Sequence, residues 1–142
     1  MKTTLVQKLL LGAAGMTAFA VGALILVAPH GFYRGYGIEL GRDPSLLSEL
    51  RAPGAGLAAA GLLMFLGCIR TGWAQLSAVL AVMVFTAFPA GRLVGLAVDG
   101  LPSDSVLGAL ALELAIGGLC CLGLRPLLVP RAGALVPPAQ PG

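Results

Sequence analysis

The chain has 142 residues, which is enough for one domain. Hydrophobic residues make up 58% of the sequence and charged residues only 11%, whereas a soluble globular domain carries about 25% charged residues. This composition excludes a soluble domain, because so few charged side chains cannot cover its surface. The net charge of +3 comes from Lys and Arg residues spread along the chain without a basic run, so no nucleic-acid partner is expected.

The first apolar stretch, residues 9–28, is long enough to cross a bilayer, which requires about 20 mostly apolar residues. A cleaved signal peptide is the alternative, because Lys2 and Lys8 precede the stretch and Ala18-Phe19-Ala20 fits a cleavage site. The apolar run continues past that site to Ala28, which favours an uncleaved membrane helix.

The remaining predicted spans are residues 52–69, 73–91 and 105–124. Asp43 is a suitable N-cap for a helix that begins at Pro44, so the second span is predicted to start as early as residue 44, and the third to extend to residue 98. Residues 1–125 are therefore predicted to form one all-α domain, a polytopic membrane four-helix bundle. Residues 126–142, rich in Pro, Gly and Ala, are predicted to be a disordered cytoplasmic tail.

The distribution of charge predicts the orientation of the bundle. One side would hold Lys2, Lys8, Arg70, Arg125 and Arg131 and no acidic residue. The other side would hold Arg34, Arg42, Arg51 and Arg92 with Glu39, Asp43, Glu49, Asp99 and Asp104. Because Arg51 and Arg92 are predicted to lie inside the membrane, the positive-inside rule places both termini in the cytoplasm. Phe32, Tyr33 and Tyr36 then follow the first span, where an aromatic belt is expected.

Small residues spaced four apart predict close helix packing. They are Ala14, Ala18 and Gly22 in the first span, Ala52, Gly56 and Ala60 in the second, and Gly91 and Gly95 in the third. Such rows let the backbones of membrane helices approach one another. Packing within one bundle explains all three rows, and a dimer face is the alternative for one of them.

Charged residues are predicted to meet near the outer side of the membrane. Arg51 and Arg92 lie equally far along the chain from the turn at residues 71–72, so a regular antiparallel hairpin would bring them to one level. Glu113 would lie roughly 12–14 Å inside the fourth span, at about the same depth, given a rise of about 1.5 Å per residue. It shares a helix face with the small residues Ala109, Gly117 and Cys120, so it is predicted to point into the bundle. Glu49 and Asp99 are further members of the predicted cluster.

Three interpretations of this cluster remain open. Charged groups inside a bilayer cost at least about 2.5 kcal/mol each, so they pair with one another or line a cavity. The cluster would then be a closed ion-pair network, a pocket whose two guanidinium groups bind a carboxylate or phosphate headgroup, or a path for protons or ions.

No catalytic or metal-binding arrangement is visible in the sequence. The chain has one histidine and no Cys-x-x-Cys pair, so neither a metal site nor another cofactor is predicted. Cys68, Cys120 and Cys121 are interpreted as free thiols within apolar segments. An enzyme is the least favoured class, because no pair of nucleophile and base can be assembled.

The order of the charged positions resembles a bacterial family, the domain of unknown function 4345. The resemblance rests on Glu49-Leu50-Arg51 before a glycine-rich stretch, then Gly91-Arg92, Asp99-Gly100-Leu101-Pro102 and Glu113, and it covers about residues 8–124. Pro53 stands where an aromatic residue would be expected in that family. The resemblance implies four membrane helices in a bacterial cytoplasmic membrane and no known reaction. A looser likeness to DoxX-like membrane proteins concerns only the fold.

Three functional hypotheses follow. The first is a non-enzymatic bundle that binds an amphiphile or lipid headgroup at the layer of Arg51, Arg92 and Glu113. The second is an accessory subunit of a larger membrane complex. The third is a proton-coupled transporter that must form a homo-oligomer, with Glu113 as its proton site, because four short helices without repeats make a poor transporter alone.

Overall fold

The computed structural model describes residues 3–129 and contains six α-helices and one short 3-10 helix in this range. They are α1 (Leu5–Val27), α2 (Pro29–Arg34), α3 (Pro44–Ile69), the 3-10 helix η1 (Thr71–Trp73), α4 (Ala74–Asp99), α5 (Asp104–Gly123) and α6 (Arg125–Leu128). Among these residues, four helices are long and apolar enough to cross a membrane: α1, α3, α4 and α5. The chain is therefore an all-α membrane helical bundle.

Local signals explain where the helices begin and end. A capping box between Thr4 and Gln7 starts α1 four residues before the predicted span. The Asp43 carboxylate accepts a 3.0 Å hydrogen bond from the backbone N–H of Ser45, so α3 begins at Pro44 as predicted. At its far end, α4 stops at Gly100, whose φ of 94° favours glycine.

The C-terminal boundary differs from the prediction. Residues 126–128 belong to α6, and Leu127 is buried against the core, so the predicted disordered tail began too early. The apolar side chains Leu127 and Leu128 bind this turn to the bundle, which composition alone does not indicate. Residues 130–142 of the predicted tail lie outside the described residues.

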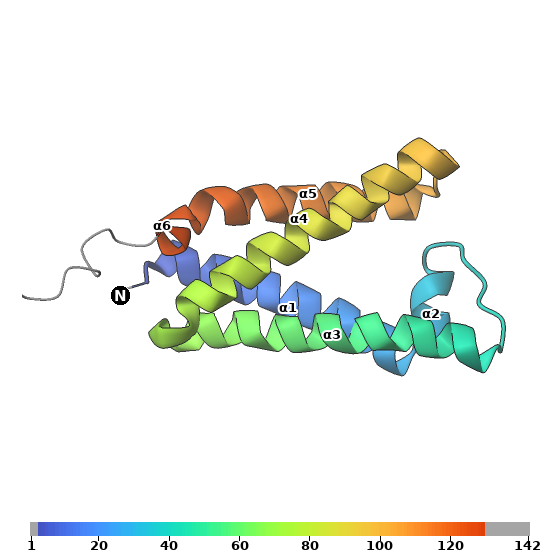
Figure 1. Cartoon of the computed structure of the whole chain (residues 1–142), viewed down its shortest axis with the longest axis horizontal. Coiled ribbons are helices and arrows are strands. Elements are labelled where there is room, and N and C mark those ends of the chain that lie inside the picture. Colours follow the sequence, from blue (N-terminus) through green and yellow to red (C-terminus); the bar gives the residue numbers. More distant parts are fainter. Residues whose placement is uncertain (1–2, 130–142) are drawn as a thin grey trace, which may run out of the picture.

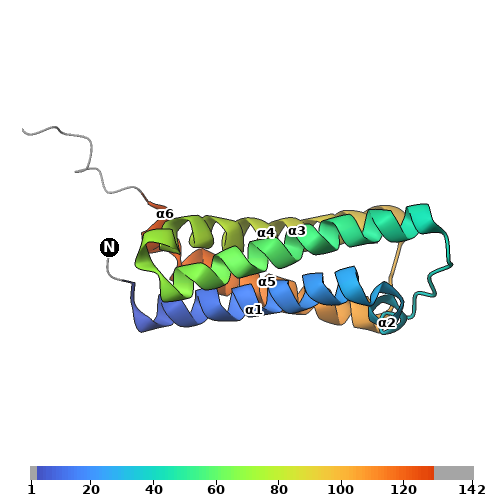
Figure 2. The ribbon, with the colours of Figure 1, turned by 90° about the horizontal axis from the view of Figure 1, so that it is seen from below.

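The closest helix pair is α1 and α3, which run antiparallel side by side (Figure 2). A Cβ added at Gly15 would lie 2.8 Å from the carbonyl oxygen of Gly61, and one added at Gly22 would overlap the backbone of α3 near Gly54. Glycines seven residues apart on each helix thus face one another. Their missing side chains allow backbone contact, which membrane helices use where no hydrophobic driving force exists.

Only some of the small residues spaced four apart lie in contacts between helices. Ala14, Ala18 and Gly22 are buried in α1. In α3, however, Ala52 and Gly56 are exposed, and in α4 Gly91 is exposed with no atom near the position of a Cβ. These three exposed residues therefore do not mediate close helix packing within this chain, although Ala60 of the second row packs against the core. The glycines of α3 that meet α1, Gly54 and Gly61, lie seven residues apart rather than four.

The bundle is closed at one end and splayed at the other. Near the α3–α4 turn, the hydroxyl of Ser77 donates a 2.6 Å hydrogen bond to the carbonyl oxygen of Leu63 in α3. From there α4 leaves α3 and crosses toward α5, and α2 lies at the end where the two pairs of helices separate (Figure 1). The fully buried Leu11, Met64 and Leu124 fill the closed end, which also holds the N-terminus of α1 and helix α6.

Candidate functional site

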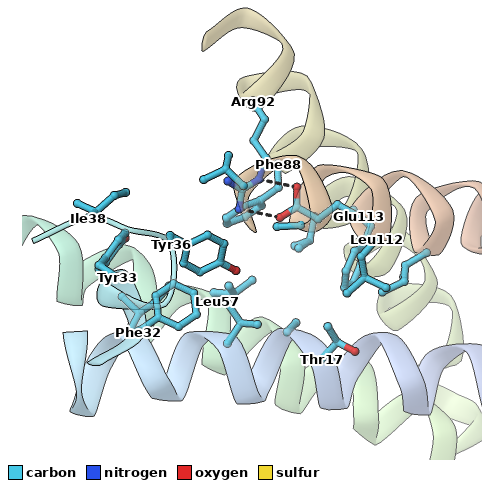
Figure 3. Close-up of a pocket in the computed structure, with 18 residues that line it drawn as sticks. Thr17, Phe32, Tyr33, Tyr36, Ile38, Leu57, Phe88, Arg92, Leu112 and Glu113 are labelled. Atoms are coloured by element: carbon cyan, nitrogen blue, oxygen red, sulfur yellow. Dashed lines mark hydrogen bonds and ion pairs between the residues drawn. The ribbon is translucent and has the colours of Figure 1, made fainter. Parts of the chain in front are cut away.

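A cavity of about 210 Å³ lies inside the splayed half of the bundle. Its walls come from α1, α2 and the segment after it, α4 and α5, with Leu57 as the contribution of α3 (Figure 3). Most of the lining is apolar. The polar side chains in it are those of Thr17, Tyr33, Tyr36, Arg92 and Glu113.

Arg92 and Glu113 form a two-pronged ion pair on one wall of the cavity. The Nε of Arg92 donates to Oε2 of Glu113 at 2.9 Å, and its Nη2 donates to Oε1 at 3.0 Å. The two side chains are 29% and 17% exposed. This parallel geometry is the strongest arrangement available to a guanidinium and a carboxylate.

The crossing of α4 and α5 brings the two residues together. Gly117 has no side chain, and the carbonyl oxygen of Phe85 occupies the space that a Cβ would need. Arg92 lies two turns beyond Phe85, and Glu113 lies one turn before Gly117, so both project on the same side of this crossing. The inward direction predicted for Glu113 is observed.

The ion pair leaves hydrogen-bonding capacity unused. A guanidinium carries five N–H donors, and Glu113 takes two of them. The remaining donors of Arg92 make no hydrogen bond to the described residues, and each oxygen of Glu113 retains a lone pair. The wall is therefore polar but electrically balanced.

Aromatic side chains are concentrated around this cavity. The chain has eight aromatic residues, five Phe, two Tyr and one Trp, and five of them line the cavity: Phe32, Tyr33, Tyr36, Phe85 and Phe88. Phe32 contacts both tyrosines, with ring centroids 5.3 Å from Tyr33 and 5.1 Å from Tyr36. Tyr36 directs its hydroxyl toward the centre of the cavity (Figure 3).

Two hydrogen bonds hold the aromatic segment in place. The hydroxyl of Ser103, before α5, donates to the carbonyl oxygen of Tyr36 at 2.9 Å. The ring of His30 lies 3.2 Å from the carbonyl oxygen of Gly41. Burial raises the pKa of Tyr33, against a smaller lowering effect of Arg92, so its phenol remains a protonated donor at neutral pH.

The other predicted site residues do not join this ion pair. Glu49, Arg51 and Asp99 are exposed. Arg51 lines a separate groove beside Leu26 of α1, and Asp99 lines a hollow at the α4–α5 end that Arg92 also reaches. Within residues 3–129, the pair Arg92–Glu113 is the only salt bridge.

The predicted three-helix cluster assumed a regular hairpin, and among the described residues the structure joins only Arg92 and Glu113 of this cluster in an ion pair. Helix α4 diverges from α3 beyond the turn that joins them (Figure 1), and Arg51 and Arg92 line different pockets although both lie equally far from this turn. The prediction also missed Tyr33 and Tyr36 as cavity residues. Their position after the first span was visible in the sequence, but it indicated an aromatic belt rather than a short helix across the splayed end of the bundle.

These features define a multi-pass membrane protein with a largely apolar cavity and a single ion pair in its wall. A family model described as "Domain of unknown function (DUF4345)" matches residues 6–124. The chain belongs to this family, as its charged positions predicted. No curated protein and no solved structure matches it. The looser likeness to DoxX-like proteins stays a prediction.

Proposed function

We propose that this protein is a non-enzymatic membrane bundle that binds a small amphiphile in the cavity between α1, α2, α4 and α5. The observation that carries the proposal is the ion pair of Arg92 and Glu113 on the wall of an otherwise apolar cavity. Ligand sites commonly combine apolar walls with a few polar groups that fix orientation.

The rim of the cavity supports access from the lipid. Among its lining residues, Ile38, Phe88 and Leu112 are 44%, 41% and 56% exposed, and all three are apolar. An amphiphile dissolved in the bilayer can pass such a rim without losing its apolar surroundings. Its polar headgroup would then reach Arg92 and Glu113, and its tail would remain at the rim.

The proposed setting is the cytoplasmic membrane of a bacterium, with both termini in the cytoplasm. Lys8, Arg70 and Arg125 lie at the closed end of the bundle, near the N-terminus, the α3–α4 turn and α6. The positive-inside rule supports placing this end in the cytoplasm. The cavity would then occupy the outer half of the membrane.

Native mass spectrometry of protein extracted gently from its host membrane tests the proposal. The wild type is expected to carry a stoichiometric small-molecule mass, and Arg92→Gln is expected to lose it. Arg51→Gln is the matched control, because it removes an arginine that lines a different groove. This control is expected to keep the mass.

A second variant separates loss of ligand from loss of fold. Arg92→Gln leaves Glu113 without its partner, whereas Arg92→Gln/Glu113→Gln removes both charges together. A folded double variant without the bound mass supports the proposal. A wild type without any bound molecule, or an Arg92→Gln variant that retains it fully, contradicts the proposal.

A further inference from the structure

The cavity combines a balanced polar wall with most of the aromatic side chains of the protein. We infer that the bound amphiphile has an uncharged, flat ring as its headgroup, and that this ring carries a carbonyl or hydroxyl oxygen. This inference rests on the proposed function. Charge, ring shape and hydrogen bonding each support one part of this inference.

The charge of the lining favours an uncharged headgroup. Arg92 and Glu113 are the only charged side chains among the lining residues, and they neutralise one another. An anion that approaches Arg92 also meets the carboxylate of Glu113. A cation that approaches Glu113 also meets the guanidinium of Arg92. Because the remaining walls are largely apolar, nothing else compensates for the lost hydration of an ion.

The aromatic lining favours a flat ring. Phe32, Tyr33 and Tyr36 approach the cavity from α2 and the segment after it, and Phe85 and Phe88 come from α4. Aromatic pairs in stacked or edge-to-face arrangements attract one another beyond the effect of burying their area. A saturated ring of the same size would bury similar area without this attraction.

The volume supports a single ring system. The cavity, at about 210 Å³, is smaller than the pockets of about 300–1,000 Å³ that hold drug-sized ligands. A headgroup of one or two fused rings therefore fits, and an apolar tail would leave past Ile38 or Leu112.

The unused hydrogen-bonding groups of the cavity favour a ring that carries an oxygen atom. The N–H groups of Arg92 that Glu113 does not use can donate to a carbonyl or hydroxyl oxygen, and Tyr36 presents its hydroxyl to the cavity (Figure 3). A hydroxyl on the ligand can in turn donate to Glu113. An oxygen on the ring would thus satisfy polar groups that a pure hydrocarbon leaves unpaired.

Three two-ring probes of similar size test the inference. They are 1-naphthol, which is uncharged and flat at neutral pH, 1-naphthoate, which is an anion, and decahydro-1-naphthol, which is uncharged and saturated. Equilibrium dialysis against the protein in nanodiscs, compared with empty nanodiscs, measures their binding. The wild type and Arg51→Gln are expected to bind 1-naphthol about tenfold more tightly than either other probe.

Glu113→Gln tests the role of charge directly. The substitution frees Arg92 from its carboxylate, so the preference is expected to shift toward 1-naphthoate by about tenfold or more. Phe88→Leu is expected to reduce the advantage of 1-naphthol over its saturated analogue. The first variant changes the charge of the wall, and the second removes an aromatic ring from it without changing its charge.

The outcomes distinguish this inference from the function on which it rests. Equal or tighter binding of 1-naphthoate to the wild type overturns the uncharged headgroup, and equal binding of decahydro-1-naphthol overturns the flat ring. If no probe binds while the protein retains a molecule from its host membrane, the inference fails and the proposed function stands. If no probe binds and no such molecule is present, both fail.

Discussion

The bond between Arg92 and Glu113 is the residue-scale feature on which the site depends. Each charge alone would be costly inside the bundle, and each lowers the cost of the other by a parallel pair of hydrogen bonds at 2.9 and 3.0 Å. The pair needs no third charge, which explains how Glu49, Arg51 and Asp99 can lie apart from it. It also explains why its wall of the cavity is polar without a net charge.

A double-mutant cycle measures how much the pairing of Arg92 with Glu113 contributes to stability. Arg92→Gln and Glu113→Gln are each expected to lower the free energy of unfolding by about 1–3 kcal/mol, because each leaves one partly buried charge unpaired. The double variant is expected to lose less than the sum of the two, since it leaves no charge without a partner. Thermal unfolding in one detergent provides the comparison, and purely additive effects would show that the pair does not couple α4 to α5.

At the scale of the helices, the contact of α1 with α3 forms the rigid half of the bundle. Gly15 and Gly22 of α1 face Gly61 and Gly54 of α3 through backbone contacts. By contrast, α4 approaches α5 through one glycine, Gly117, at Phe85. Tight packing over the full length of one pair and a single close crossing in the other leave room for the cavity.

The glycines of α3 offer a matched comparison. A Cβ at Gly61 would overlap the backbone of α1 at Phe19, whereas a Cβ at Gly56 would meet no atom within 4 Å. Gly61→Val is therefore expected to lower the free energy of unfolding by about 1–3 kcal/mol or more through overpacking. Gly56→Val is expected to change it by about 0.5 kcal/mol or less. Equal losses in thermal unfolding would contradict the α1–α3 contact as described.

The whole molecule has one closed and one splayed end, and the two ends differ in charge. The closed end carries Lys8, Arg70 and Arg125, and the splayed end carries the described acidic residues other than Glu113 together with Arg34 and Arg42. If the closed end faces the cytoplasm, as proposed, the aromatic segment with Tyr33 and Tyr36 covers the cavity from the outer side.

Cysteine labelling tests this orientation. Gly41 and Gly72 are exposed, have no atom near the position of a Cβ, and lie in the segments at opposite ends of α3. A membrane-impermeant maleimide is expected to label Gly41→Cys in intact spheroplasts and Gly72→Cys only after lysis. The wild type provides the background from Cys68, Cys120 and Cys121, which lie within the spans. The opposite labelling pattern would place the closed end outside.

The sequence by itself determined that four helices are long and apolar enough to cross a membrane, whereas it gave no sign of the short helices α2 and α6. An apolar run in lipid satisfies its backbone hydrogen bonds within itself by forming a helix, so a local property of the sequence is sufficient to predict the helix. The cap at Asp43 and the stop at Gly100 are likewise local. The inward direction of Glu113 followed from the small residues that share its face, Gly117 and Cys120, which are buried in the structure.

Only the tertiary structure decided which faces of the helices meet. A helix that is apolar all round has no hydrophobic face from which its rotation can be read, so the choice of Gly54 and Gly61 over Ala52 and Gly56 was not visible. Whether Arg51 and Arg92 share a pocket depends on how far α4 diverges from α3, and the cavity role of Tyr36 depends on α2 lying across the splayed end of the bundle. These are properties of contacts between segments distant in the chain, and no local pattern encodes them.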